Sequence, residues 1–113
     1  MAGKIQIINP KDLDFTEEDG MQERKLANKA SGSSRVGFEH AIIPAGLEAK
    51  GVVYEGQDEL VYFIKGKAEI GFDGQKKIVE PGGFFLIPDG VPYDFKVLEG
   101  PIEAVAAFGP PRD

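Results

Sequence analysis

Short apolar runs separated by glycine or proline dominate the sequence from residue 44 onward. These turn residues recur about every ten positions, which is the spacing of strands in an antiparallel sandwich or barrel. The 15 glycines and 8 prolines make up roughly a fifth of the 113 residues, and helical periodicity is almost absent. We therefore expect an all-β chain, and its length suits a single domain.

The clearest predicted hairpin covers residues 67–79. Apolar side chains at positions 68, 70 and 72 alternate with other residues as far as Asp73-Gly74, a dipeptide that favours a tight primed turn. Turn signals separate nearly all of the remaining apolar runs. The other predicted strands cover residues 4–8, 36–43, 50–54, 59–65, 84–87, 93–97 and 102–108.

The N-terminal third differs from the rest because residues 10–35 are polar and carry both acidic and basic runs. We expect a mobile or partly extended arm here, with residues 21–27 adding an edge strand. Thr16 is a fair cap for one helical turn over residues 15–19. The predicted organisation is an N-terminal strand and polar arm over 1–34, a β-barrel over 35–109 and a C-terminal tail over 110–113.

Composition excludes several classes of function. The chain has no cysteine, so thiol nucleophiles, iron–sulfur clusters and zinc ribbons are ruled out. Its formal charge is −6, and it lacks the clustered lysine and arginine that bind nucleic acids or anionic membranes. No window approaches the roughly 20 apolar residues of a membrane span. We expect a cytoplasmic protein with neither a nucleic-acid nor a membrane partner.

The strand predicted over residues 102–108 is apolar on both faces. A strand of this kind must be covered twice. The second cover is either another sheet of the same chain or a partner subunit, and the latter predicts a homodimer.

Two stretches of the sequence resemble the motifs of the cupin superfamily. The first motif has a glycine, a His-any-His pair, a glutamate and a glycine; the second has a glycine, Pro-any-Gly, a histidine and an asparagine. The matching residues are Gly46, Glu59 and Gly66 in the first motif, and Gly82, Pro88 and Gly90 in the second. The resemblance spans residues 46–97 and implies the cupin double-stranded β-helix, a jelly-roll barrel in a single domain.

The metal-binding histidines of the family correspond to Val52, Tyr54 and Tyr93 in this chain, so only the carboxylate of Glu59 is retained. Valine supplies no donor atom, and a phenol with an ordinary pKa near 10 ligates at a cost. We therefore predict a degenerate metal site and carry over neither a metal nor another cofactor.

His40 is the only histidine of the chain. On an alternating strand it shares a face with apolar residues 36, 38 and 42, and we expect that face to point into the barrel while Glu39 points outward. A lone histidine on an apolar face is more often a hydrogen-bonded core residue than a ligand. The alternative is a metallocupin, acting as a dioxygenase or lyase, whose non-standard ligands come from His40, Tyr54, Glu59 and Tyr93.

The leading hypothesis places three catalytic residues at the mouth of the barrel. Glu59, enclosed by valines, would have its pKa raised by desolvation, which suits a general base near neutral pH. Tyr54 and Tyr93 would donate a proton or hold a substrate oxygen. We expect a small oxygenated acid or sugar-like ligand and a metal-independent isomerase, lyase or cyclase.

Among cupins with a degenerate motif, the chain is loosely similar to the small cupin associated with ethanolamine utilisation. The matching residues are Asp58-Glu59, the apolar strand that runs to Gly66, and Phe85-Leu86-Ile87-Pro88. These residues are mostly scaffold, and the sequence has no phosphate-binding Gly-Lys-Ser/Thr motif. A non-catalytic binding or assembly module with a vestigial pocket is therefore a further alternative, and whether the protein is an enzyme stays open.

Overall fold

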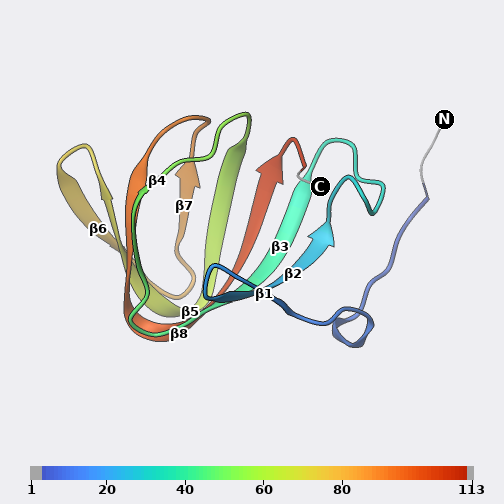
Figure 1. Cartoon of the computed structure of the whole chain (residues 1–113), viewed down its shortest axis with the longest axis horizontal. Helices are drawn as coiled ribbons and strands as arrows, with labels where there is room; N and C mark the ends of the chain where they lie inside the picture. Colours follow the sequence, from blue (N-terminus) through green and yellow to red (C-terminus); the bar gives the residue numbers. More distant parts are fainter. Residues whose placement is uncertain (1–3, 112–113) are drawn as a thin grey trace.

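The computed structural model describes residues 4–111 as one antiparallel sheet that curls around a central core (Figure 1). The all-β prediction is confirmed, since a short 3-10 turn is the one helical element among these residues. No helix in the described part of the chain is long and apolar enough to cross a membrane. In chain order the elements are η1 (Pro10–Asp12), β1 (Thr16–Glu18), β2 (Met21–Ala27), β3 (Gly37–Ile43), β4 (Glu48–Val52), β5 (Asp58–Phe72), β6 (Gln75–Val79), β7 (Phe84–Ile87) and β8 (Tyr93–Gly109).

Two long strands, β5 and β8, organise the sheet. The first half of β5 pairs with β7 and its second half with β6, while β8 pairs first with β4 and then with β3. The two long strands also pair with each other, and the sheet order is β1-β2-β3-β8-β5-β6. Each long strand therefore contributes to both halves of the barrel.

The long strands bend where their pairing becomes irregular. Register shifts in β5 between Phe63 and Ala68 interrupt its ladder with β8. Gly66 lies within this bend at φ +89°, and a Cβ there would come within 2.6 Å of the Ile102 side chain. Glycine is thus required by both backbone conformation and space. The turn signals between residues 65 and 67 and between residues 97 and 102 predicted separate strands. The structure instead has one bent strand at each place, because a bend inside a strand has the same sequence signals as a turn between two strands.

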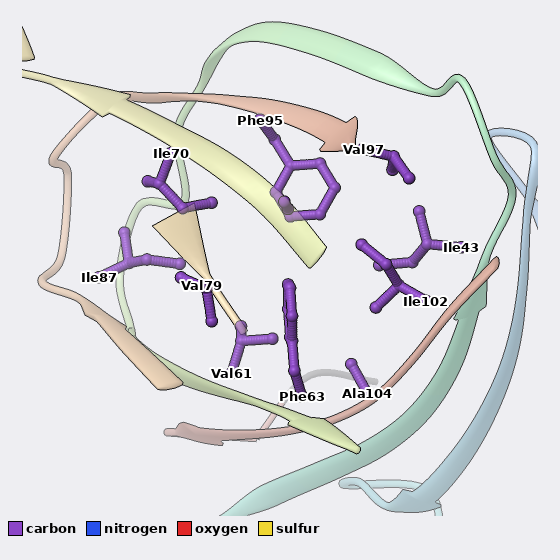
Figure 2. Packing of buried hydrophobic residues seen from close by; sticks show 11 residues of the cluster. Ile43, Val61, Phe63, Ile70, Val79, Ile87, Phe95, Val97, Ile102 and Ala104 are labelled. Atoms are coloured by element: carbon purple, nitrogen blue, oxygen red, sulfur yellow. The ribbon is translucent and has the colours of Figure 1, made fainter. Parts of the chain in front are cut away.

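The space between the two halves is filled by aliphatic and aromatic side chains (Figure 2). Phe63 and Ile102 are the largest fully buried side chains, and Phe63 packs edge-on against Phe95 with ring centroids 6.4 Å apart. Edge-to-face packing of this kind adds to the stabilisation from burial. Four residues of this core also line a cavity inside the barrel: Ile43, Val61, Phe95 and Ala104.

The polar N-terminal segment enters the sheet as a hairpin. Asp19 and Gly20 both adopt positive φ, 54° and 81°, and join β1 to β2 with Glu18 opposite Met21. Positive φ at both central positions defines a primed turn, which turns the chain back as a hairpin. The strand predicted over 21–27 is confirmed as β2, but it is not an edge strand, because β1 pairs with its outer side. The helical turn predicted over 15–19 is wrong because this turn imposes extended pairing on β1.

Residues 4–8 form no strand, contrary to the sequence prediction. Ile5 and Ile7 are 94% and 81% exposed, so no neighbouring strand or core covers their apolar side chains. Alternation alone does not make a strand when its backbone has no ladder to join. The predicted division at residues 34 and 109 stays a prediction, and residues 1–3 and 112–113 of its outer segments lie outside the described part of the chain.

Candidate functional site

A cavity of about 230 Å³ opens inside the barrel, between the core and the β1–β2 turn. Side chains from β2, β3, β4, β5, β7 and β8 line it, so it is assembled from segments far apart in sequence. The three predicted catalytic residues, Tyr54, Glu59 and Tyr93, all line this cavity. The structure thus brings them together, and their catalytic roles stay predictions.

Small side chains leave the room for the cavity. Ala41 on β3 pairs with Ala104 on β8, and the next inward position of β8 is Ala106, which pairs with Val61 on β5. All three alanines line the cavity. Because an alanine fills less of the barrel than a leucine or a phenylalanine, three of them in adjacent rows create a hollow in an otherwise filled interior.

Aromatic rings form one wall of the cavity. Tyr54 and Tyr93 lie with ring centroids 6.5 Å apart, and Phe85 contacts Tyr93 edge-on at 5.7 Å. Phe85 also packs on Phe63 of the core, at 6.1 Å. The wall is therefore continuous with the hydrophobic core, which restricts the orientations available to the two tyrosines.

Two loops are joined to each other beside the catalytic candidates. The Gly56 amide donates to Asp89, and the Asp89 amide donates to Asp58, at 2.7 and 2.8 Å. The Gly90 amide donates to the Tyr54 carbonyl at 2.8 Å. These bonds hold the segment after β4 against the segment after β7, and so fix Tyr54 relative to the start of β5.

Glu59 is a buried carboxylate, with 6% of its surface exposed. It lies on the inward face of β5, with Val61 as the next inward residue and Val52 on the same cavity wall. Gln57, also buried, has its amide nitrogen 3.5 Å from the Glu59 carboxylate, a long distance for a hydrogen bond. Sequence reasoning missed Gln57, since a polar residue in a predicted turn carries no signal of burial.

The orientation predicted for β3 is wrong. His40 points to the outside of the barrel, whereas Glu39 is 7% exposed and lines the cavity. The strand is apolar on both faces, and the period-two pattern therefore does not decide which face is inside. The face built on Gly37, Ala41 and Ile43 is the inner one.

His40 is held in a polar cluster on the outer surface of the sheet. An Arg24 guanidinium nitrogen lies 2.7 Å from its Nδ1, and its Nε2 lies 2.8 Å from the Glu103 carboxylate. Because guanidinium has no acceptor, Nδ1 accepts and Nε2 carries the hydrogen that is donated to Glu103. Arg24 also donates to the Pro10 carbonyl and stacks on Phe15, which ties the N-terminal segment to the barrel wall. His40 is thus hydrogen-bonded, as expected for a lone histidine that is not a metal ligand, but it lies on the outer face of the sheet rather than in the core.

Two further acidic residues missed by sequence reasoning line the cavity. Glu23 on β2 stands opposite Ala41, and Asp19 occupies the β1–β2 turn. The sequence does not single out either residue, because the polar composition of residues 10–35 predicts a mobile or partly extended arm. The Asp19-Gly20 dipeptide is the signal that could have placed them, since it matches the Asp73-Gly74 turn of the other hairpin.

The residues present do not fit a cupin metal. At the four family ligand positions, the cavity presents a valine, two phenols and one carboxylate, and His40 is on the other side of the sheet. Within residues 4–111, no three His, Cys, Asp or Glu side chains are grouped so that they could hold a metal ion. The phenols and the one carboxylate at these four positions are a poor donor set for the transition metals that imidazole sites select.

Comparison with known proteins identifies the fold. A family model described as a cupin domain matches residues 40–108. No curated protein sequence matches significantly. The structure of KdgF from Halomonas sp. superposes with a TM-score of 0.82 at 21% identity, covering 96% of this chain and 97% of that one.

Two other solved structures show the same likeness. An RmlC-like cupin from Shewanella frigidimarina has a TM-score of 0.80 at 16% identity, over 97% of this chain and 95% of that one. Ectoine synthase from P. lautus has a TM-score of 0.82 at 20% identity, over 95% and 79%. At these identities the structures support the jelly-roll fold alone. Together with the family match, they show that this chain belongs to the cupin family.

Proposed function

We propose that the chain binds a small oxygenated organic molecule in the barrel cavity and catalyses proton transfer on it without a metal, as an isomerase, lyase or cyclase. The observation that carries the proposal is the convergence of a buried carboxylate, Glu59, and two phenols, Tyr54 and Tyr93, on one cavity. A similar structure is named as a synthase, so the fold is compatible with catalysis.

The proposed chemistry begins with the carboxylate of Glu59, which accepts a proton from a carbon next to a substrate carbonyl. The C–H bonding pair forms a double bond to the carbonyl carbon, and the carbonyl π pair moves to the oxygen. A phenol of Tyr54 or Tyr93 stabilises the resulting oxyanion by donating a hydrogen bond. Return of the proton to another carbon completes an isomerisation, whereas loss of a leaving group completes an elimination. The aromatic wall and the valines exclude water from this step.

The test is hydrogen–deuterium exchange at carbons next to a carbonyl, followed by proton NMR for a set of small carbonyl compounds in deuterated buffer. We expect the protein to accelerate exchange in a subset of the compounds. Glu59→Gln keeps the size of the side chain and removes the base, so the acceleration should fall by at least about 100-fold. Glu80→Gln changes an exposed glutamate in a distant turn and should retain the full rate.

The outcomes separate the enzyme from a binding module. If Glu59→Gln exchanges as fast as the unchanged protein, Glu59 is not the base and the proposed mechanism is wrong. If no compound exchanges faster than in buffer, while ligands still bind the cavity, the non-catalytic alternative gains support. Ala106→Leu, which fills the hollow beside Val61, should abolish binding in either case.

We also propose that two copies of the chain pair through the outer face of the sheet. The support is an apolar outer face, which we define by six exposed side chains: Phe38 on β3, Leu60, Tyr62 and Ile64 on β5, and Phe84 and Leu86 on β7. Leu60 pairs with Leu86 and Tyr62 pairs with Phe84, so these four residues are contiguous, and Ala107 of β8 stands between Leu60 and Phe38. Because every copy carries this face, two copies can bury it against each other across a two-fold axis.

A cytoplasmic location and the absence of nucleic-acid partners stay predictions from composition.

A further inference from the structure

The charges that face the cavity all have the same sign. Four carboxyl side chains line it, and no lysine, arginine or histidine in the described part of the chain does so. Two of the four are more than nine-tenths buried. The carboxyl residues are Asp19, Glu23, Glu39 and Glu59.

Two basic residues near this end of the barrel, Arg24 and Lys25, do not line the cavity. Arg24 bonds His40 and the Pro10 carbonyl on the outer face of the sheet. Lys25 stands opposite Glu39 in the β2–β3 ladder, but it is exposed and does not line the cavity. A ligand that enters the cavity therefore meets negative potential, which attracts cations and opposes carboxylates and phosphates.

The remaining walls suit an organic cation. Tyr54, Tyr93 and Phe85 present rings whose centroids are 5.7 to 6.5 Å apart along the wall, and aromatic faces attract ammonium groups. The cavity holds about 230 Å³, less than the roughly 300 Å³ at which drug-sized pockets begin. The absence of any three metal-binding side chains grouped together in the described residues argues against an inorganic cation.

We propose that the natural ligand of this cavity carries an ammonium group, held between the carboxylates of Glu39 and Glu59 and the aromatic wall. The inference rests on the proposed function, in that the same molecule would bring its carbonyl to Glu59, and it narrows the ligand class. An amine or amino-carbonyl compound fits this site, and a free carboxylic acid does not.

The test compares three probes with four carbon atoms each that differ in charge: butylammonium, 1-butanol and butanoate, titrated by isothermal calorimetry. We expect butylammonium to bind at least about tenfold more tightly than 1-butanol, and butanoate to bind most weakly. Glu39→Gln and Glu59→Gln should each remove most of this preference for the cation. Glu80→Gln should keep it, and thermal unfolding of each variant establishes that the barrel is folded.

Three results would overturn the inference. The first is equal or tighter binding of 1-butanol or butanoate, and the second is no measurable binding of butylammonium. The third is displacement of butylammonium by Mg²⁺ or Ca²⁺ at concentrations where Na⁺ does not displace it, which would indicate a metal site. Failure of the proposed function can be told apart from failure of this inference. In the former case, Glu59→Gln leaves proton exchange unaffected while the preference for butylammonium over 1-butanol persists.

Discussion

The two faces of β5 have opposite characters. Along its first half, Glu59, Val61 and Phe63 point into the barrel, while Leu60, Tyr62 and Ile64 point outward and are 38% to 46% exposed. The inner face becomes more polar towards the cavity, and the outer face stays apolar throughout. Burying a carboxylate and exposing three apolar side chains is unfavourable for the isolated chain. Such an inversion is characteristic of binding surfaces, and it supports the two proposals of a ligand inside the barrel and a second copy outside it.

The largest effect should come from the end of β5 where the inner face is purely structural. Phe63 is fully buried and packs on Phe85 and Phe95, so Phe63→Ala should lower the free energy of unfolding by about 3–5 kcal/mol. Urea unfolding followed by far-ultraviolet circular dichroism measures the loss. Ile64→Ala, on the adjacent outward side chain, should cost only about 1 kcal/mol. Similar losses for the two variants would contradict the assignment of the faces.

The next largest effect on stability should come from β3, whose orientation in the structure is opposite to the predicted one. The ring of Phe108 occupies the space that a Cβ on Gly37 would need. Gly37→Ala should therefore destabilise the fold by about 1–3 kcal/mol through overpacking. Adding Phe108→Leu should make the double variant less unstable than the sum of the two single changes. Strictly additive free energies in the same urea assay would show that the inner face of β3 is not packed in this way.

The outer face is tested by placing a charge on it. Leu86 is 60% exposed on β7, and Leu86→Glu should weaken the proposed dimer at least about tenfold while leaving the barrel folded. Analytical ultracentrifugation over a concentration series measures this change. Ile78→Glu, on an exposed residue of β6 outside the apolar outer face, is the matched control. A protein that is monomeric before any substitution would refute the dimer proposal.

The smallest effect should come from the polar cluster beside the apolar outer face. Glu103→Gln weakens the contact with His40, and we expect a loss below about 1 kcal/mol because the Glu103 side chain is 27% exposed. The chain contains no second histidine, so the His40 ring signals in NMR follow the local change directly. A loss of several kcal/mol would mean that this cluster supports the inner face as well.

The fold was predictable because its turns are local. The two motifs and the Asp73-Gly74 hairpin depend on a few neighbouring residues, and the structure retains each of them. The Asp19-Gly20 hairpin was predictable on the same principle, but a preceding acidic run resembled the first turn of a helix. The continuity of β5 and β8 could not be predicted from the sequence, because the bend near Gly66 depends on contact with Ile102, which is distant in sequence.

The candidate site was predictable only in part, for a related reason. Tyr54, Glu59 and Tyr93 stand at spacings that the family pattern defines, and the cavity unites them. Glu39 follows no such pattern. Its orientation depends on which face of β3 the rest of the barrel covers, and both faces of that strand are apolar. Hydrophobic alternation therefore shows that residues two apart share a face, but not which face points inward. The apolar outer face makes that choice ambiguous for β3.

The distribution of tyrosines gives each face of the sheet an optical label of its own. The chain has three tyrosines and no tryptophan; Tyr54 and Tyr93 line the cavity, and Tyr62 lies on the apolar outer face. Tyrosine therefore dominates the near-ultraviolet spectrum of the folded protein. In a Tyr62→Phe variant the tyrosine signal comes from the cavity pair alone and reports ligand occupancy. In a variant with phenylalanine at positions 54 and 93, the remaining signal comes from Tyr62 and tests the proposed association of two copies, and neither measurement needs an attached dye.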